Sequence, residues 1–298
     1  MDEFSLLAEN AEEFGLVWTG PPTVTRVETP IDGTRALRAI AWGETPAHAV
    51  LLHGGAQNAH TWDTVALALG HPLLAIDLPG HGRSDWRTDH HYSVKGNATD
   101  VAAAMDSLIG APRPVIGMSL GGLTTIALGA ARPELVTRMM LVDVTPGVNR
   151  EKAEPITAFV SGPENFASFD EILERTVQFN PTRSVASLRR GILHNAVENP
   201  DGTWRWRYDR MRLSTAHDEE GHHGSVPDFG GLWDELEGYP GPIWLVRGST
   251  SGVVSDDDVT ELQRRRPDAH VEVVDGAGHS VQGDRPVELA ALIEEFLR

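Results

Sequence analysis

The feature that most constrains the fold is a serine flanked by glycines, Gly117-Met118-Ser119-Leu120-Gly121. It follows a short apolar run, Val115-Ile116, and precedes a segment rich in Ala and Leu. A serine in a tight turn between a strand and a helix has strained backbone angles, and small residues two positions to either side let the two elements approach closely. We therefore expect Ser119 to lie just beyond the end of a strand, beside the free backbone amides of the first helical turn that follows. An ordinary glycine-containing loop is the alternative, so the neighbouring segments must decide.

Strand and helix patterns alternate along most of the chain. Short apolar runs predict strands at residues 49–52, 73–76, 115–116, 139–142 and 243–246, and a further strand is predicted at residues 271–274. Helical spacing predicts helices at residues 93–108, 120–131, about 255–266, and from about 286 onward. An Asp32-Gly33 turn joins two alternating segments, residues 23–29 and 36–42, and predicts an antiparallel pair. This order predicts an α/β fold with a mostly parallel, eight-stranded twisted sheet and helices on both faces.

Two segments fall outside this alternation. Residues 1–20 show no strand period and predict a helical arm that packs on the body or serves an interface in a homo-oligomer. Residues 147–208 are polar and rich in aromatic side chains, and they predict a helical cap or lid without a buried strand. An insertion after a strand's carboxyl end lies over the crevice where such sheets bind ligands. The α/β core is then predicted at residues 21–146 and 209–298.

Composition excludes several classes of function. No stretch approaches the roughly 20 apolar residues of a bilayer span, and the acidic start lacks the pattern of a signal peptide, so we predict a cytoplasmic protein without a membrane partner. The absence of cysteine excludes disulfides and thiolate nucleophiles. A net charge of -18 opposes binding to nucleic acid or anionic membranes. A neutral or cationic small molecule is therefore the expected partner.

A nucleophilic serine needs a base within hydrogen-bond reach, and the chain offers one after its last predicted strand. The glycines of Asp275-Gly276-Ala277-Gly278-His279 let the loop turn so that His279 points back over the sheet. A surface histidine is the alternative for His279 taken alone. Its pairing with Ser119 favours a catalytic role.

Four motifs together resemble the α/β-hydrolase family. In chain order they are His53-Gly54-Gly55, Asp77-Leu78-Pro79-Gly80-His81-Gly82-Arg83-Ser84, residues 117–121, and Gly276-Ala277-Gly278-His279. The resemblance spans most of the chain outside the arm and the cap, and it is more specific for the fold than for the reaction. It implies that Ser119 is a nucleophile and His279 its general base.

The acid of a catalytic triad is where the chain departs from the usual family pattern. Most relatives carry it shortly after the strand that ends here at Arg247-Gly248, where this chain has Ser251. Haloalkane dehalogenases and the zearalenone-type lactonases look similar to this chain in placing an acid at the preceding strand end, here Asp143. The resemblance implies that Asp143 orients His279, and a purely structural aspartate is the alternative.

Three further aspartates stay open as the acid: Asp256, Asp257 and Asp258. Ser255 followed three residues later by Asp258 is typical of a helix cap, and acids in a first turn are favoured by the helix dipole. Asp143 is therefore the preferred candidate.

Acyl transfer also needs donors for the developing oxyanion. The backbone amide of Leu120 is one candidate, and that of Gly55, or else Ala56, is the other. His53 and His81 are predicted to hold loops together. The predicted substrate-pocket residues are Ala56, Met118, Trp206 and Tyr208. Residues 203–209 alternate aromatic and charged side chains like a strand or hairpin, so packing between cap and body is the alternative for the last two.

Two histidine pairs, at residues 90–91 and 222–223, lack a third ligand at a suitable spacing. The sequence therefore predicts neither a metal ion nor a cofactor.

The leading hypothesis is a cofactor-independent serine hydrolase that cleaves a carboxylic ester or lactone through an acyl-enzyme. A serine in place of an aspartate nucleophile disfavours dehalogenase and epoxide hydrolase chemistry. The aromatic cap favours a hydrophobic, uncharged substrate. Two alternatives remain open: carbon–carbon bond hydrolysis by the same triad, and a small-molecule receptor with slow turnover on the same scaffold.

Overall fold

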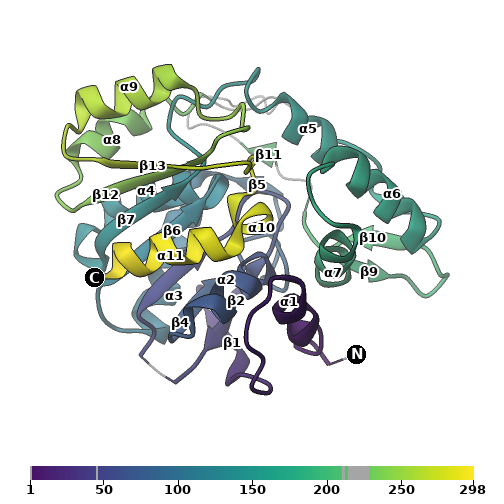
Figure 1. Cartoon of the computed structure of the whole chain (residues 1–298). Helices are drawn as coiled ribbons and strands as arrows, with labels where there is room; N and C mark the ends of the chain where they lie inside the picture. The colour runs from purple at the N-terminus through teal and green to yellow at the C-terminus, as the bar shows by residue number, and fades with distance from the viewer. Residues whose placement is uncertain (1, 45, 210–211, 214–227) are drawn as a thin grey trace.

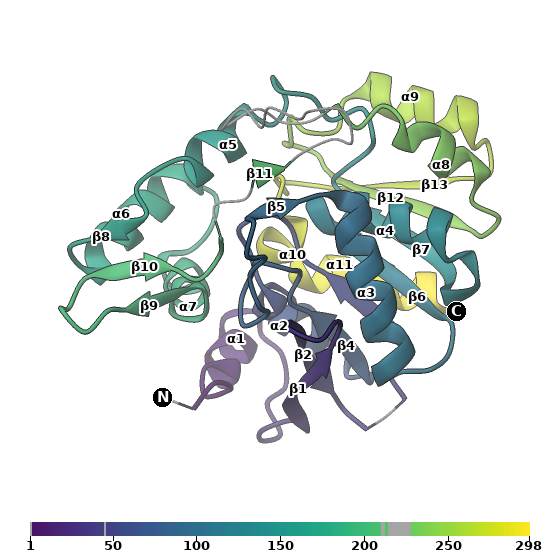
Figure 2. The same cartoon turned by 180° about the vertical axis from the view of Figure 1, so that it is seen from behind.

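A computed structural model describes residues 2–44, 46–209, 212–213 and 228–298. An eight-stranded sheet forms its centre (Figures 1 and 2). Across the sheet the strands are β1 (Val24–Pro30), β2 (Ala36–Trp42), β4 (Leu73–Ile76), β3 (Ala49–Leu52), β6 (Arg113–Met118), β7 (Val136–Val142), β12 (Ile243–Gly248) and β13 (His270–Val274). Neighbours from β4 to β13 pair in parallel, whereas β2 pairs antiparallel with β1 and β4. The predicted sheet is confirmed.

Helices cover both faces of the sheet, which explains why the central strands are apolar throughout. Every residue of β3 and β4 is buried. One face packs against α3 (Val94–Leu108), α4 (Leu120–Ala131), α8 (Leu232–Gly238) and α9 (Asp256–Arg265). The other packs against α1 (Leu7–Glu13), η1 (Ala59–Trp62), α2 (Asp63–Leu69), α10 (Val281–Asp284) and α11 (Pro286–Leu297). A short turn of helix, η2 (Pro133–Leu135), leads into β7.

Between β7 and α8, residues 154–206 lie beside the sheet and have a small apolar core of their own (Figure 1). It contains α5 (Glu154–Val160), α6 (Phe169–Phe179) and α7 (Val185–Asn195). A three-stranded sheet of β8 (Asn165–Phe166), β10 (Trp204–Trp206) and β9 (Ala196–Glu198) joins them. The segment expected as a strand or hairpin thus contains the strand β10, and the prediction of a cap without a buried strand was wrong, because Trp206 of this central strand is buried. Further along, β11 (Arg212–Leu213) pairs with β5 (His91–Tyr92). We keep residues 147–208 as the proposed extent of this insertion.

The arm contains the short helix α1, which packs on α2 and reaches the insertion. Leu7 and Ala11 are buried against the body. On α7, the buried Arg190 donates to Asn10 Oδ1 at 2.6 Å and forms an ion pair with Glu13. The arm therefore links body and insertion. In the described part of the chain no helix has the length and apolarity needed to cross a bilayer.

Candidate active site

Ser119 occupies a strained turn between β6 and α4. Its backbone angles are φ 51° and ψ -117°, and its amide donates to Val142 O at 3.1 Å. A Cβ atom on Gly117 would lie 2.4 Å from Gly121 O, and one on Gly121 would lie 2.3 Å from Leu52 O. Both glycines are therefore required for strand and helix to approach this closely, as the sequence motif predicts.

His279 connects Ser119 to a buried aspartate. Its Nε2 atom lies 3.1 Å from Ser119 Oγ, and its Nδ1 atom lies 2.8 Å from Asp143 Oδ2. A carboxylate can only accept, so we assign the ring proton to Nδ1, which leaves Nε2 free to accept from the serine hydroxyl. The order nucleophile, base and acid is that of a serine hydrolase triad.

The Asp143 carboxylate is fully buried after β7 and is held by three donors. Besides His279, the amide of Gly248 donates to Oδ1 at 3.0 Å and the hydroxyl of Ser251 donates to Oδ2 at 2.5 Å. Ser251 stands where most relatives were expected to carry the acid. In this chain it fixes the orientation of an acid on the neighbouring strand.

The three alternative aspartates lie at the start of α9. Asp258 forms a capping box with Ser255 and an ion pair with Lys152 at 2.6 Å. The exposed Asp256 pairs with Arg247 at 2.5 Å, and Asp257 is exposed on the same helical turn. All three lie in the first turn of α9, where capping and ion pairs engage two of them.

Of the amides considered for the oxyanion, Ala56 N is already engaged. It donates to His81 Nε2 at 3.0 Å, and Gly54 N donates to Gln57 Oε1 at 3.1 Å. Among described residues nothing accepts from Gly55 N. Leu120 is the first residue of α4, where amides have no intrahelical acceptor. The structure thus leaves Gly55 and Leu120 as the available pair.

Two fully buried histidines hold the loop that carries Gly55. His53 Nε2 accepts from Leu78 N at 2.9 Å, and its Nδ1 donates to Gly54 O at 2.8 Å. His81 accepts from Ala56 N and donates to Pro79 O at 3.0 Å. Both rings use one nitrogen as acceptor, so both are neutral. The predicted structural role is consistent with these contacts.

Acidification should destabilise the protein through this pair. Burial lowers the pKa of His53 from 6.5 to about 4, and burial together with the neighbouring His53 lowers that of His81 to about 3. The unfolded chain therefore binds protons first as the pH falls below 6.5, so stability is lost from there down to about 4, on the order of 3 kcal/mol per histidine. Urea unfolding at a series of pH values measures this loss.

A variant separates this effect from general acid denaturation. His81→Gln is expected to be less stable at neutral pH and to lose less of its remaining stability between pH 6.5 and 4 than the wild type does, whereas the exposed His48→Gln retains the wild-type slope. An equal pH dependence of the free energy of unfolding in all three proteins would contradict the assignment of His81 as a buried, neutral histidine.

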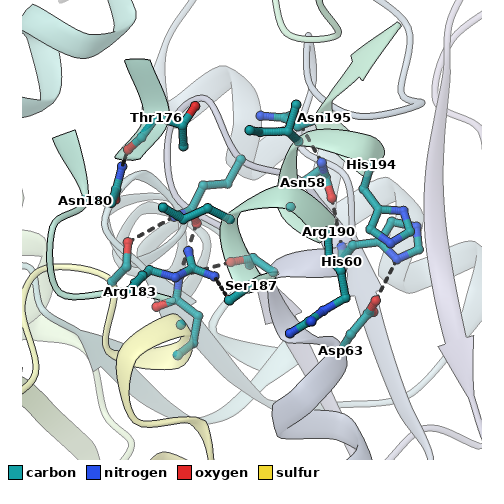
Figure 3. Close-up of a pocket in the computed structure, with 18 of the residues that line it drawn as sticks. Asn58, His60, Asp63, Thr176, Asn180, Arg183, Ser187, Arg190, His194 and Asn195 are labelled. Atoms are coloured by element: carbon teal, nitrogen blue, oxygen red, sulfur yellow. Dashed lines mark hydrogen bonds and ion pairs between the residues drawn. The ribbon is translucent and has the colours of Figure 1, made fainter. Parts of the chain in front are cut away.

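A cavity of about 320 Å³ opens onto Ser119 and His279. Its apolar walls come from Met118, Pro155, Ile156, Phe159, Val160 and Phe179, and Ala56 also lines it. A second cavity of about 160 Å³ adjoins it between insertion and body (Figure 3). Ala56, Gln57, Phe159, Asn180 and Ser280 line both.

Two predicted pocket residues lie elsewhere. Trp206 lines the second cavity and not the one at Ser119, and Tyr208 lines neither. Trp206 belongs to β10, the central strand of the small sheet. Its side chain is part of the apolar core of the insertion. Tyr208 stacks on it with ring centroids 5.6 Å apart.

The histidine pairs considered from the sequence do not form a metal centre where they are described. His90 pairs with Asp209 at 2.6 Å, and His91 belongs to β5. His222 and His223 lie outside the described residues.

Comparison with known proteins gives a consistent result. The sequence model of the alpha/beta hydrolase family matches residues 49–292. The esterase Rv0045c of Mycobacterium tuberculosis is 44% identical over 100% of this chain and 96% of its own length. A solved structure of that esterase, which is inhibited by transition metals, superposes on this chain with a TM-score of 0.86 at 43% identity. The match covers 100% of this chain and 99% of the esterase chain. The sn-1-specific diacylglycerol lipase ABHD11 of Xenopus laevis is 30% identical over 83% of this chain and 78% of its own length.

Proposed function

Because the chain belongs to the alpha/beta hydrolase family, we propose that Ser119, His279 and Asp143 are its catalytic triad. The chain is an ester-hydrolysing serine hydrolase, as its full-length likeness to an esterase indicates. The observation that carries the assignment of residues is the continuous hydrogen-bonded chain from Ser119 Oγ through His279 to the buried Asp143 carboxylate.

In the first half of the proposed reaction, Ser119 Oγ attacks the ester carbonyl carbon while His279 Nε2 takes its proton. The Asp143 carboxylate stabilises the resulting imidazolium and keeps its ring in place. The amides of Gly55 and Leu120 donate to the oxyanion of the tetrahedral intermediate. The intermediate then breaks its bond to the alcohol oxygen, which receives the proton from His279, and an acyl-enzyme remains.

Water completes the cycle. His279 removes a proton from a water molecule that attacks the acyl carbon, and the same two amides stabilise the second oxyanion. Cleavage of the bond to Ser119 Oγ releases a carboxylic acid, and the proton returns to the serine. With a lactone, the alcohol and the acid are the two ends of one product.

The proposed substrate is a hydrophobic, uncharged ester or lactone. The six apolar side chains that line the cavity at Ser119 support this choice, because burial against them would remove water from a charged group. Asp284 also lines the cavity and would repel a negatively charged substrate. A cytoplasmic location stays a prediction of the sequence. So does an oligomer formed through the arm, of which Val17 and Trp18 remain exposed.

Rapid mixing with a short-chain nitrophenyl ester tests the acyl-enzyme. We expect a burst of about one nitrophenol per chain when deacylation is slower than acylation. Acid quenching followed by peptide mass mapping should then locate the acyl group on Ser119. An acyl group on another side chain would refute the assignment of the nucleophile.

A series of esters and lactones of graded size tests the substrate class. Turnover should rise as the apolar acyl group becomes larger, until it fills the cavity of about 320 Å³. It should fall for acyl groups with a charged end. Hydrolysis of ketone substrates with no ester turnover would favour the carbon–carbon hydrolase. Binding without turnover across the whole series would favour a receptor.

A further inference from the structure

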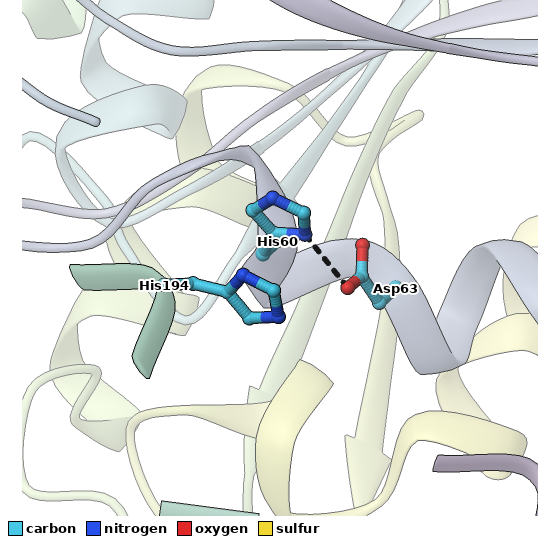
Figure 4. A group of neighbouring side chains, drawn as sticks. All are labelled: His60, Asp63 and His194. Atoms are coloured by element: carbon cyan, nitrogen blue, oxygen red, sulfur yellow. Dashed lines mark hydrogen bonds and ion pairs between the residues drawn. The ribbon is translucent and has the colours of Figure 1, made fainter. Parts of the chain in front are cut away.

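Three side chains with metal-ligating atoms meet at the junction of body and insertion (Figure 4). His60 belongs to η1, Asp63 begins α2, and His194 lies in the last turn of α7. One nitrogen or oxygen atom from each lies within 4.8 Å of the other two. The cluster therefore joins two parts of the chain that are distant in sequence.

Two of these groups have a polar atom that lacks a hydrogen-bond partner among the described residues. Asp63 is 2% exposed, and its Oδ2 atom lies 2.9 Å from His60 Nδ1. Its Oδ1 atom is buried, and no group in the described chain donates to it. His194 has no hydrogen bond or ion pair with any described residue, although its ring stacks on His60 at a centroid distance of 3.6 Å. A buried carboxylate oxygen without a partner costs stability, and a bound cation would remove that cost.

The surroundings of His60 match those of a metal-binding histidine. Its second nitrogen, Nε2, lies 3.1 Å from Glu3 Oε1 and 3.3 Å from Arg26 Nη2, and the carboxylate is the nearer partner. Histidine ligands of metal ions commonly donate their other N–H to a carboxylate, which fixes the tautomer and the ring orientation. Glu3 is itself held by Arg26 at 2.5 Å. Arg26 also pairs with Asp77 at 2.7 Å, so carboxylates on both sides offset its positive charge.

The distances require only a small closure of the cluster. Bonds of about 2.0 to 2.2 Å to a tetrahedral ion place ligand atoms roughly 3.3 Å apart. The His60–Asp63 contact of 2.9 Å is already near that value. His194 must approach, and it is the ligand that no described hydrogen bond restrains.

We propose that His60, Asp63 and His194 form a binding site for one divalent transition-metal ion of the zinc type. Two imidazoles and a carboxylate suit Zn²⁺, Co²⁺, Ni²⁺ or Cu²⁺, whereas Ca²⁺ and Mg²⁺ prefer a shell of oxygen atoms. All three side chains line the cavity of about 160 Å³, so a water molecule can complete the coordination (Figure 3). The sequence alone predicted no metal ion at these residues.

The ion would join α7 to η1 and α2. The neighbouring residue already ties the same helix end to the body, since Asn195 Nδ2 donates to Ala56 O at 2.7 Å and Asn195 Oδ1 accepts from Asn58 Nδ2 at 3.1 Å. A metal bond beside these contacts strengthens the docking of the insertion. Binding to the folded state alone also raises the melting temperature.

Zn²⁺ and Co²⁺ titrations of the metal-free full-length protein test the proposal. The key variant is His194→Phe, which keeps an aromatic ring against His60 and removes the ligand nitrogen. The matched control is His71→Phe, because His71 lies beside His48 and 2.6 Å from Glu294, another neighbourhood of histidines and an acid. A pH of about 8 favours displacement of the proton between His60 and Asp63.

The wild type and His71→Phe should bind one Zn²⁺ per chain and melt at a higher temperature with it. Bound Co²⁺ should show the visible absorption of a tetrahedral site. In His194→Phe the dissociation constant should rise at least tenfold, and the zinc-dependent rise in melting temperature and the cobalt spectrum should disappear. An unchanged melting temperature of the metal-free variant establishes that it folds.

Two results would overturn the site: equal zinc binding by wild type and His194→Phe, or loss of binding in His71→Phe instead. Should His194→Phe not fold, Asp63→Asn takes its place with the same expected losses. Metal stoichiometry and melting are read without substrate, so failure of the triad assignment would leave these results unaffected.

Discussion

Replacing Ser119 with alanine is expected to lower kcat about a millionfold, the loss found when the nucleophile of a serine hydrolase is removed. The hydroxyl oxygen forms the covalent bond to the acyl group, and His279, 3.1 Å away, has no other described group to activate. The Michaelis constant should change little, because the walls of the cavity stay in place. Single-turnover kinetics with a nitrophenyl ester measures the loss. The residual rate reports the contribution of the oxyanion amides and of binding.

Ser280→Ala is the matched control, because this serine lines the same cavity but has no hydrogen bond to His279 in the described chain. Its turnover should stay within tenfold of the wild type. A loss in Ser280→Ala comparable to that in Ser119→Ala would contradict the assignment of the nucleophile.

Asp143→Asn should lower kcat about ten-thousandfold. An asparagine of the same shape keeps an oxygen for Gly248 N, and its amide nitrogen can donate to Ser251 Oγ, so the fold should persist. It cannot stabilise the imidazolium by charge, and it favours the tautomer of His279 that presents the wrong nitrogen to Ser119. Steady-state kinetics across pH, with the melting temperature as a check on folding, measures the effect.

Asp256→Asn provides the comparison for the acid. The Asp256 side chain is 90% exposed and pairs only with Arg247 among described residues, so turnover should stay within twofold. The opposite ranking of the two variants would assign the acid to α9. Ser119→Ala combined with Asp143→Asn should be no slower than Ser119→Ala alone, since the triad acts as a unit.

Most of the sheet follows from short-range sequence patterns. Strands such as β3 and β4 are buried on both faces, so their sequences are apolar without interruption and are easily recognised. The turn at Ser119 was predictable because Gly117 and Gly121 are required by contacts with neighbouring backbone. The helix α2 was not predicted, because residues 64–69 are almost wholly apolar and carry no helical period.

The parts of the site that could not be predicted depend on long-range contacts. Nothing local to Ser251 indicates that its hydroxyl meets Asp143, which is 108 residues away. The choice between Gly55 and Ala56 depends on His81, which engages one of the two amides across a different loop. Trp206 was correctly placed in a strand, but the face it presents is set by the pairing of β10 between β8 and β9.

The contact between arm and insertion has a practical consequence for attaching this enzyme to a surface or a reporter. Asn10 and Glu13 lie against Arg190 of the insertion. At the other end of the chain, Phe296 O accepts from Arg138 near the start of β7, whereas Asp143 follows the carboxyl end of that strand. The two termini accordingly lie on different sides of the molecule (Figure 1). A fusion partner or immobilising tag before α1 would crowd the insertion, so a support is better attached after α11, where substrate entry stays open.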